Sequence, residues 1–327
     1  MNILKTESAP SAGLPRNERY RENRKHGIPG FPCSMYVADY RLEGSTPSYH
    51  CSPHWQNEIE VLHFEKGEYQ YAVNMDSSST DEECFIFVNS GELHSLDVGE
   101  GYVEQALLFQ PSLLSSGGMD AAEELVIGPL MRGELSLPRY IGPDSPAFPV
   151  IRSEYARILR TFEQAGEIRR DQRNASGAAS QMRIRAGILN ILAELSEQDL
   201  LTSRRPSGTQ RLEAMKKVVT YIRDHYQEKI YIKDLARIMN MNEQYFCRFF
   251  KKATGRTPIT YINEVRIRHV VLFLRQTDRS ITEVALGCGF GNMGHFIEEF
   301  RKITGEAPST YRAKLAAEEN RHTRYLS

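Results

Sequence analysis

The chain has 327 residues, 40% hydrophobic and 25% charged, which suits two globular domains and excludes a disordered or fibrous protein. Its net charge of −1, taken alone, argues against a polyanionic partner. The charge is unevenly divided, however, because residues 210–327 hold 21 Lys and Arg against 13 Asp and Glu, whereas residues 1–209 hold 20 against 29.

No run approaches the roughly 18 consecutive apolar residues of a membrane span. The first 27 residues also lack the apolar core of a signal peptide. We therefore expect a cytoplasmic protein without a membrane partner. The five cysteines are scattered and show no CxxC spacing, so they indicate neither a disulfide framework nor a thiolate zinc site.

The first part of the chain predicts a polar, disordered tail over residues 1–28 and a β domain over residues 29–118. In the β domain, short apolar runs alternate with turn-forming stretches such as 76–79 (Asp-Ser-Ser-Ser). Short strands at this spacing are typical of a small barrel or sandwich. The runs are Glu58–Phe64, Tyr69–Val73, Cys84–Val88 and Ala106–Phe109.

Residues 119–201 change character from irregular to helical. One helical period joins Tyr155, Ile158, Leu159 and Phe162, and a second places apolar side chains on one face. That second helix, Gln181–Glu197, is our candidate for a dimer contact, and the alternative is a helix packed on the barrel. The apolar side chains of its face are Met182, Ile188, Leu189, Leu192 and Leu195. Residues 202–210 then read as a linker.

The last hundred residues contain one short unit twice. Residues 245–261 and 295–311 share the pattern aromatic-Phe, Phe, basic-Lys, Gly, Pro and Tyr at a constant offset of 50, which indicates a duplicated supersecondary element. Each copy predicts a helix, a turn and a second helix. Ser280 and Glu283 have the spacing of a capping box, Asn240 suits a left-handed turn position, and Asn242 and Asn292 are N-cap residues.

The second helix of each unit has a buried rear and a polar front. Phe246/Phe250 and Phe296/Phe300 recur every four residues and form the buried stripe. Together with the positive charge of this part, the polar front suits a helix that enters a DNA major groove. A helical bundle with a charged, solvated face is the alternative.

These residues resemble the C-terminal signature of the AraC/XylS-type transcriptional regulators. The resemblance covers about residues 212–312 and implies a DNA-binding domain over residues 211–315, followed by a polar tail over 316–327. It also implies two helix-turn-helix units joined by a long helix at about 258–275. The two units would place recognition helices in successive major-groove segments about 10 bp apart on double-stranded DNA.

The resemblance also implies roles for single residues. Gln244 and Arg248 match base-contacting positions in the first recognition helix, 242–252, where Arg suits guanine and Gln suits adenine. Gly294 and Glu298 hold the corresponding positions in the second, 292–303. Because Glu298 repels phosphates, we expect the second helix to contribute mainly backbone contacts. The candidate phosphate contacts are Asn242, Lys251, Lys252, Asn292, Arg301 and Lys302.

The front part resembles the cupin barrel and the ligand-sensing domain of AraC-type regulators. The resemblance rests on the stretch 53–60 (Pro-His-Trp-Gln-Asn-Glu-Ile-Glu), Gly67, and Asn89-x-Gly91-x2-His94. Strand alternation would send His54, Gln56, Glu58 and Glu60 to one side of the sheet, and a later strand would add His94. The expected effector-binding residues are His54, Trp55, Gln56, Glu58, Glu60 and His94.

Three uses of this polar group remain open. We rank hydrogen bonding to a small molecule first, with carbohydrates favoured from the resemblance, and a structural polar network second. A metal site at His54, Glu60 and His94 comes third, because Gln56 replaces a histidine of the enzyme motif. No cofactor is therefore expected.

The fold expected from these observations is α+β with two domains: a cupin-like β-barrel with a helical linker, and an all-α double helix-turn-helix domain. The expected function is that of a DNA-binding transcriptional activator, not an enzyme, that responds to a small molecule. RNA polymerase and a second copy of the chain are further expected partners. The alternatives are a metal-dependent cupin enzyme with a DNA-binding tail, and a constitutive DNA-binding protein whose barrel serves only for dimerisation.

Overall fold

A computed structural model describes residues 27, 30–39, 49–98, 103–118, 120–164, 175–203 and 210–314. The predicted tails over 1–28 and 316–327 and the predicted linker over 202–210 lie wholly or largely outside these residues. Within the described residues, no helix is both long and apolar enough to cross a membrane.

The β domain is built on two main antiparallel sheets, and residues 135–136 pair with residues 202–203 in a separate two-stranded sheet. One has the strand order β1-β8-β3-β6-β10 and the other has the order β2-β7-β4-β5. The main strands are β1 Cys33–Asp39, β2 Tyr49–His54, β3 Ile59–Phe64, β4 Tyr69–Val73, β5 Asp76–Thr80, β6 Cys84–Val88, β7 His94–Val98 and β8 Val103–Phe109. The short strands are β9 Leu135–Ser136, β10 Tyr140–Ile141 and β11 Thr202–Ser203. The sheets enclose an apolar core that includes Phe64, Tyr69 and Leu108, which confirms the expected N-terminal β domain.

One predicted turn is wrong. Residues 76–79 form strand β5, which pairs with β4 from Val73↔Asp76 to Tyr69↔Thr80. The chain reverses instead at Asn74 and Met75, which both adopt positive φ values of 52° and 77°. A two-residue hairpin turn of this kind needs left-handed backbone at both central positions, and the glycine that would signal it in the sequence is missing.

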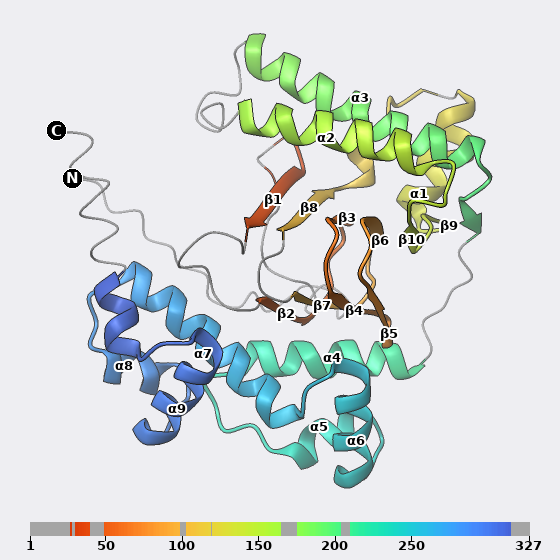
Figure 1. Cartoon of the computed structure of the whole chain (residues 1–327). Helices are drawn as coiled ribbons and strands as arrows, with labels where there is room; N and C mark the ends of the chain where they lie inside the picture. Colours follow the sequence, from red (N-terminus) through yellow and green to blue (C-terminus); the bar gives the residue numbers. More distant parts are fainter. Residues whose placement is uncertain are drawn as a thin grey trace, which may run out of the picture.

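A helical layer covers one face of the five-stranded sheet (Figure 1). It contains α1 Gly128–Arg132, α2 Phe148–Gln164 and α3 Ala175–Glu197, and a π-helical turn, Glu123–Ile127, precedes α1. The two predicted helical periods are confirmed by α2 and α3. The apolar face of α3 packs into the same core as Tyr155 and Ile158 of α2. Met182, predicted on that face, is instead 62% exposed.

The C-terminal domain is entirely helical among its described residues. Its helices are α4 Gln210–Asp224, α5 Ile232–Ile238, α6 Glu243–Thr254, α7 Pro258–Gln276, α8 Ile281–Gly287 and α9 Met293–Thr304. Asn242 accepts a hydrogen bond from Tyr245 N at 2.9 Å, and Asn292 accepts one from His295 N at 3.0 Å, so both predicted N-caps are confirmed. The capping box at Ser280 is also present.

Two helix-turn-helix units therefore pack against one long helix, α7. Phe246, Phe250, Phe296 and Phe300 are fully buried, as the four-residue spacing predicts. Asn240 takes the left-handed conformation in the first turn, with φ 53°. The N-cap position of α5, Tyr231, has no side-chain cap.

Candidate functional site

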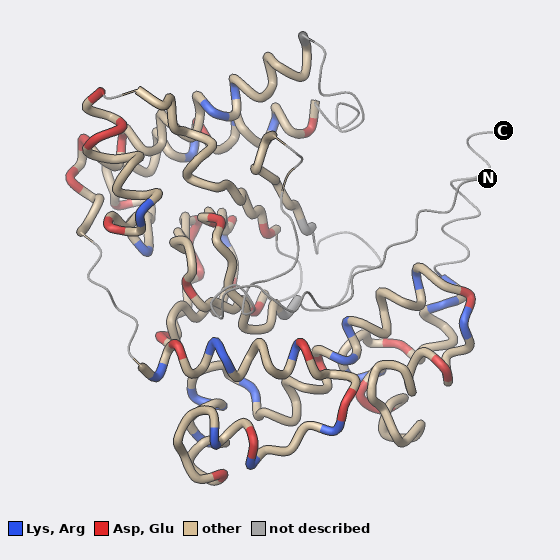
Figure 2. Tube along the Cα trace, turned by 180° about the vertical axis from the view of Figure 1, so that it is seen from behind, with Lys and Arg blue, Asp and Glu red and all other residues tan. Residues whose placement is uncertain are grey.

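The recognition-helix positions lie on the outer surface of the C-terminal domain. Gln244 and Arg248 of α6 are exposed, as are Gly294 and Glu298 of α9. The six candidate phosphate contacts are exposed as well. Figure 2 shows that Lys and Arg recur along the helices of this domain. The structure thus leaves the predicted DNA-facing side chains accessible.

The two acidic residues of α9 differ in their surroundings. Glu298 is exposed, but Glu299 turns toward α7, where it accepts a hydrogen bond from Asn263 Nδ2 at 3.1 Å and lies 3.9 Å from Lys302 Nζ. Only Glu298 therefore adds negative charge to the outward face of α9. The sequence did not distinguish these two neighbours, because the bond to Asn263 joins positions 36 residues apart.

A cluster of polar side chains lies inside the β domain. His54 ends β2 and pairs in register with His94 at the start of β7, and their rings lie 4.2 Å apart. Glu60, in β3, places Oε2 2.8 Å from His94 Nε2. Gln56 donates from Nε2 to the same oxygen at 2.9 Å. Gln56, Glu60 and His94 are buried, so these four predicted residues meet in the interior.

They do not meet for the reason expected from the sequence. The chain leaves the four-stranded sheet after His54 and enters the five-stranded sheet at Ile59. No single strand therefore carries residues 54–60, and the expected alternation is wrong. Two strands and the connecting segment bring the cluster together. Glu58 points elsewhere and accepts a hydrogen bond from Gln110 Nε2 at 3.0 Å.

Trp55 also lies outside the cluster. Its ring packs into the apolar core of the C-terminal domain, with Lys216 Nζ 5.4 Å from the ring centroid. The structure thus places Trp55 at the contact between the two domains. No local sequence pattern around Trp55 indicates this contact with the C-terminal domain.

Glu104 is a further polar group close to Glu60, and it was not predicted from the sequence. It pairs in register with Phe64, whose ring belongs to the interior core, so Glu104 points to the interior face of β8. Its Oε2 is buried without a hydrogen-bond partner among the described residues. Burial and the nearby charge of Glu60 raise the pKa of Glu104 to about 8. At neutral pH this carboxyl group is therefore mainly protonated.

Glu60 has the opposite protonation behaviour. Burial alone would raise its pKa, but the adjacent His94, the nearby His54 and the hydrogen bond from Gln56 together lower it. Glu60 is therefore ionised while Glu104 carries a proton. Two neighbouring carboxyl groups with different charge states provide both a hydrogen-bond acceptor and a donor.

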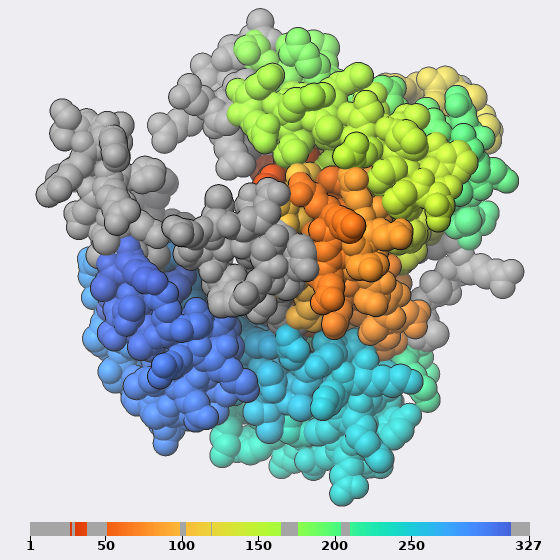
Figure 3. Space-filling view, viewed as in Figure 1, coloured from red at the N-terminus to blue at the C-terminus, as the bar shows by residue number. Residues whose placement is uncertain are grey.

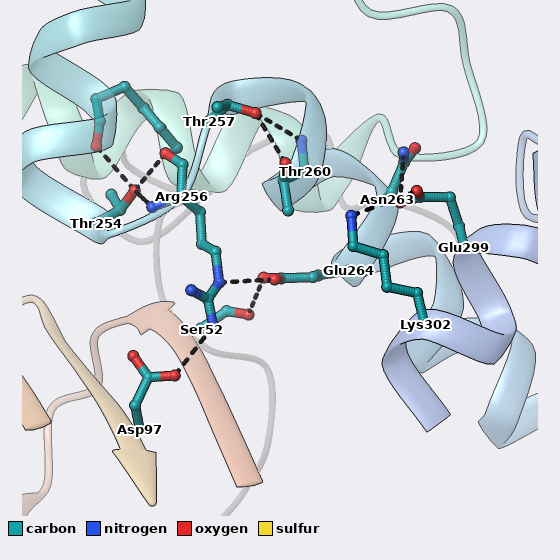
Figure 4. A network of polar contacts seen from close by, with 11 residues as sticks. Ser52, Asp97, Thr254, Arg256, Thr257, Thr260, Asn263, Glu264, Glu299 and Lys302 are labelled. Carbon is teal, nitrogen blue, oxygen red and sulfur yellow. Dashed lines mark hydrogen bonds and ion pairs between the residues drawn. The ribbon is translucent and has the colours of Figure 1, made fainter. Parts of the chain in front are cut away.

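The polar cluster lies directly beside the C-terminal domain. Strand β2, which ends at His54, packs against α4. The Tyr261 hydroxyl donates to Pro53 O at 2.8 Å, and Ser52 Oγ donates to Glu264 Oε2 at 3.1 Å. Arg256 lies between Glu264 Oε1, 3.0 Å away, and Asp97 Oδ1, 3.1 Å away (Figure 4).

The contact between the domains is continuous and partly apolar. Leu93 of the β domain is buried in the same cluster as the core of the C-terminal domain, and Met75 packs against it. Figure 3 shows the surfaces of the β domain and the helical domain in direct contact. The two residues that precede His54 thus contact α7.

Comparison with known proteins agrees with this arrangement. A family model described as an AraC-like ligand binding domain matches residues 37–123, and a helix-turn-helix domain model matches residues 235–314. The HTH-type transcriptional activator RhaS of Pectobacterium carotovorum is 24% identical over 278 residues, which cover 85% of this chain and 93% of the relative.

Two further similarities extend over most of the chain. The melibiose operon regulatory protein of Escherichia coli K12 is 23% identical over 304 residues, which cover 86% of this chain and 90% of the relative. Among solved structures, ToxT from Vibrio cholerae matches with 14% identity and a TM-score of 0.40, covering 88% of this chain and 99% of that chain. The two family models match in this order along the chain, and both relatives, which are transcription regulators, match over at least 90% of their own length. The chain therefore belongs to the AraC family of DNA-binding transcriptional regulators, with an N-terminal ligand-binding domain and a C-terminal helix-turn-helix domain.

Proposed function

We propose that the protein is a transcriptional activator whose β domain binds a small molecule rich in hydroxyl groups, with a carbohydrate as the favoured class. This proposal rests on the buried polar side chains of the β domain. Gln56 Oε1 and Glu104 Oε2 are buried without hydrogen-bond partners among the described residues. A buried polar group left unpaired costs about 1–3 kcal/mol, and ligand hydroxyl groups would supply the missing bonds.

The relatives support the finer points of this proposal. One is named as a transcriptional activator and another as the regulatory protein of the melibiose operon. An activator acts through RNA polymerase, which we therefore propose as a partner in the cytoplasm. We also propose a homodimer. Because the apolar face of α3 packs within its own chain, the dimer contact would use the exposed face around Met182.

For DNA, we propose that α6 supplies most of the sequence readout through Gln244 and Arg248. Their exposure on one helix with a buried rear supports this role, since a major groove admits such a helix. In α9, Gly294 and Glu298 hold the corresponding positions. The proposed backbone contacts are Asn242, Lys251, Lys252, Asn292, Arg301 and Lys302.

A panel of sugars and polyols tests the effector. Each compound is first screened by thermal shift, because a ligand that binds only the folded chain raises its melting temperature. Active compounds are then titrated into a fluorescence-anisotropy assay on DNA from the promoter next to the gene. We expect a compound that raises the melting temperature of the wild-type chain to change its DNA affinity as well. The same compound should change neither the melting temperature nor the DNA affinity of Gln56→Ala. Stabilisation that persists in Gln56→Ala would place the ligand elsewhere.

We further propose that the protein releases its effector chemically unaltered and is therefore not an enzyme. Incubation of each active compound with stoichiometric protein, followed by NMR of the compound, measures this directly. Recovery of unaltered compound is expected. Formation of a product that depends on Glu60 would support instead a metal-dependent enzyme joined to a DNA-binding domain.

A further inference from the structure

We propose that the β domain holds a divalent transition-metal ion between His54, Glu60 and His94. The ligand atoms that these side chains offer all lie within 4.8 Å of one another. Two atoms that are each about 2.1 Å from one metal ion lie about 3 Å apart at a right angle and about 4.2 Å apart when opposite. The three groups therefore need only a small side-chain adjustment to share one ion.

The hydrogen bonds around both histidines favour metal ligation. His54 Nδ1 lies 3.1 Å from Ser52 O, and His94 Nδ1 lies 3.0 Å from Glu92 O. A carbonyl oxygen only accepts, so each Nδ1 carries a hydrogen. In a neutral imidazole this leaves a lone pair on Nε2, which is the atom that binds a metal. Such a bond from the second nitrogen to a carbonyl commonly orients metal-ligating histidines.

Glu60 is held in place for the same purpose. Its Oε2 lies 2.8 Å from His94 Nε2 and accepts a hydrogen bond from Gln56 Nε2 at 2.9 Å. Gln56 thus acts as a positioning residue for the carboxylate. In the sequence it counted against a metal site because it stood where a further histidine was expected, but two imidazoles and one carboxylate already form a set that suits Mn, Fe, Co, Ni or Zn.

A proton shared between His94 and Glu60 is the competing explanation, and the chain contains a natural control for it. On the outer side of the five-stranded sheet, His63 Nε2 lies 3.0 Å from Glu83 Oε1. His63 Nδ1 faces the Gln105 side chain, and Glu83 is shared with Arg152. This second His–Glu pair lacks the second imidazole, and no metal site is proposed there.

The metal ion would form part of the proposed effector site. Its binding does not depend on the proposed function, but its effect on DNA affinity does. Three protein ligands leave coordination positions open. Oxygen atoms of a hydroxyl-bearing effector are suitable ligands for those positions, so the ion and the effector would bind side by side. His54 follows Ser52 and Pro53, which contact α7, so loading of the site should alter the contact between the domains.

The test uses the full chain, stripped with a chelator and titrated with ZnCl2 by calorimetry and with CoCl2 by visible absorption. We expect one ion per chain and the d–d absorption of Co²⁺ with nitrogen and oxygen ligands. His94→Ala and Glu60→Gln should abolish both signals. Gln56→Ala should weaken binding by about 10–100-fold, as the loss of an outer hydrogen bond does, and His63→Ala should bind as the wild type does.

Two results would overturn the metal site. One is the absence of stoichiometric Zn²⁺ and Co²⁺ binding in the wild type, and the other is unchanged binding in both His94→Gln and Glu60→Gln. His94→Gln keeps a polar side chain in the cluster, so it serves if His94→Ala does not fold, which circular dichroism reports. Metal binding without any change of DNA affinity would leave the metal site standing and refute its part in effector control.

Discussion

At the scale of single residues, His269 shows how burial sets a charge. Its ring stacks on Tyr226 with centroids 3.8 Å apart and an interplanar angle of 4°. Burial, together with the positive charges of Arg268 and Arg223, lowers the pKa of His269 to about 4. The ring is therefore neutral in the folded domain throughout the physiological range.

This pKa predicts an acid sensitivity of the C-terminal domain. Between pH 6.5 and about 4 the unfolded chain binds a proton at His269 that the folded chain does not, so stability falls as the pH falls through this window. Because the ring is partly exposed and screened by solvent, we expect this proton to lower the free energy of unfolding by about 1 kcal/mol between pH 7 and pH 5. His269→Phe keeps the stacking and should lose less stability on acidification, measured by urea unfolding. An identical pH dependence in both proteins would contradict this assignment.

The sequence identified the chemistry of several residues but not always their surroundings. The sequence correctly predicted that four polar side chains lie together, namely His54, Gln56, Glu60 and His94. They come from separate strands and a connecting segment, and not from one strand as expected. Glu104 escaped notice because its role depends on register with Phe64, which no local pattern encodes.

At the scale of elements, the duplication made the helical domain predictable. Capping residues, turn residues and a four-residue aromatic period are local signals, and all agree on the same helices. The strands were harder to predict. The hairpin turn at Asn74 and Met75 has left-handed backbone without glycine, so the polar stretch after it was mistaken for the turn.

Variants of the N-cap residues separate the effect of the cap on stability from its effect on DNA affinity. Asn242→Ala removes the bond to Tyr245 N and should cost about 1 kcal/mol of stability. Asn242→Asp keeps an accepting oxygen at a helix N-terminus, where negative charge is favourable, so it should unfold like the wild type. It should nevertheless bind DNA more weakly, because it brings negative charge toward the phosphates.

Unfolding curves and anisotropy titrations of the two variants measure this separation. Asn292→Ala and Asn292→Asp repeat the comparison in the second unit. Equal destabilisation by Ala and Asp would mean that the cap is not the stabilising interaction. Undiminished DNA affinity of Asn242→Asp would remove Asn242 from the proposed phosphate contacts.

At the scale of the whole molecule, α7 of the helical domain contacts β2 of the β domain. Burial raises the pKa of Tyr261 to about 12, so its hydroxyl group remains a donor to Pro53 O. The distance in sequence is 208 residues, and no sequence pattern predicts such a pair. The acidic and basic parts of the chain are thus two domains joined by a partly apolar contact that includes specific hydrogen bonds.

The repeat supplies a matched control for this contact. Tyr261 and Tyr311 occupy the same position in the two units, and each packs edge-on against a buried phenylalanine with centroids 5.6 Å apart. Among the described residues, the Tyr261 hydroxyl bonds to the β domain, whereas the Tyr311 hydroxyl accepts a hydrogen bond from Arg275 Nη2 at 3.1 Å. Tyr261→Phe should weaken domain docking by about 1 kcal/mol, seen as faster hydrogen exchange in β2 and α7, whereas Tyr311→Phe should not. Equal exchange rates in the two variants would contradict this role for Tyr261.

The central claim is that this chain reads DNA sequence chiefly through α6. The most direct test selects a binding site for the full chain from random duplexes and measures affinities for that site and for single-base variants by anisotropy. Arg248→Ala should lose about 1–3 kcal/mol of binding free energy for the selected site, together with its preference at one base pair. Lys252→Ala should weaken binding to all sequences alike. Sequence preference that is unchanged in Arg248→Ala would contradict the account.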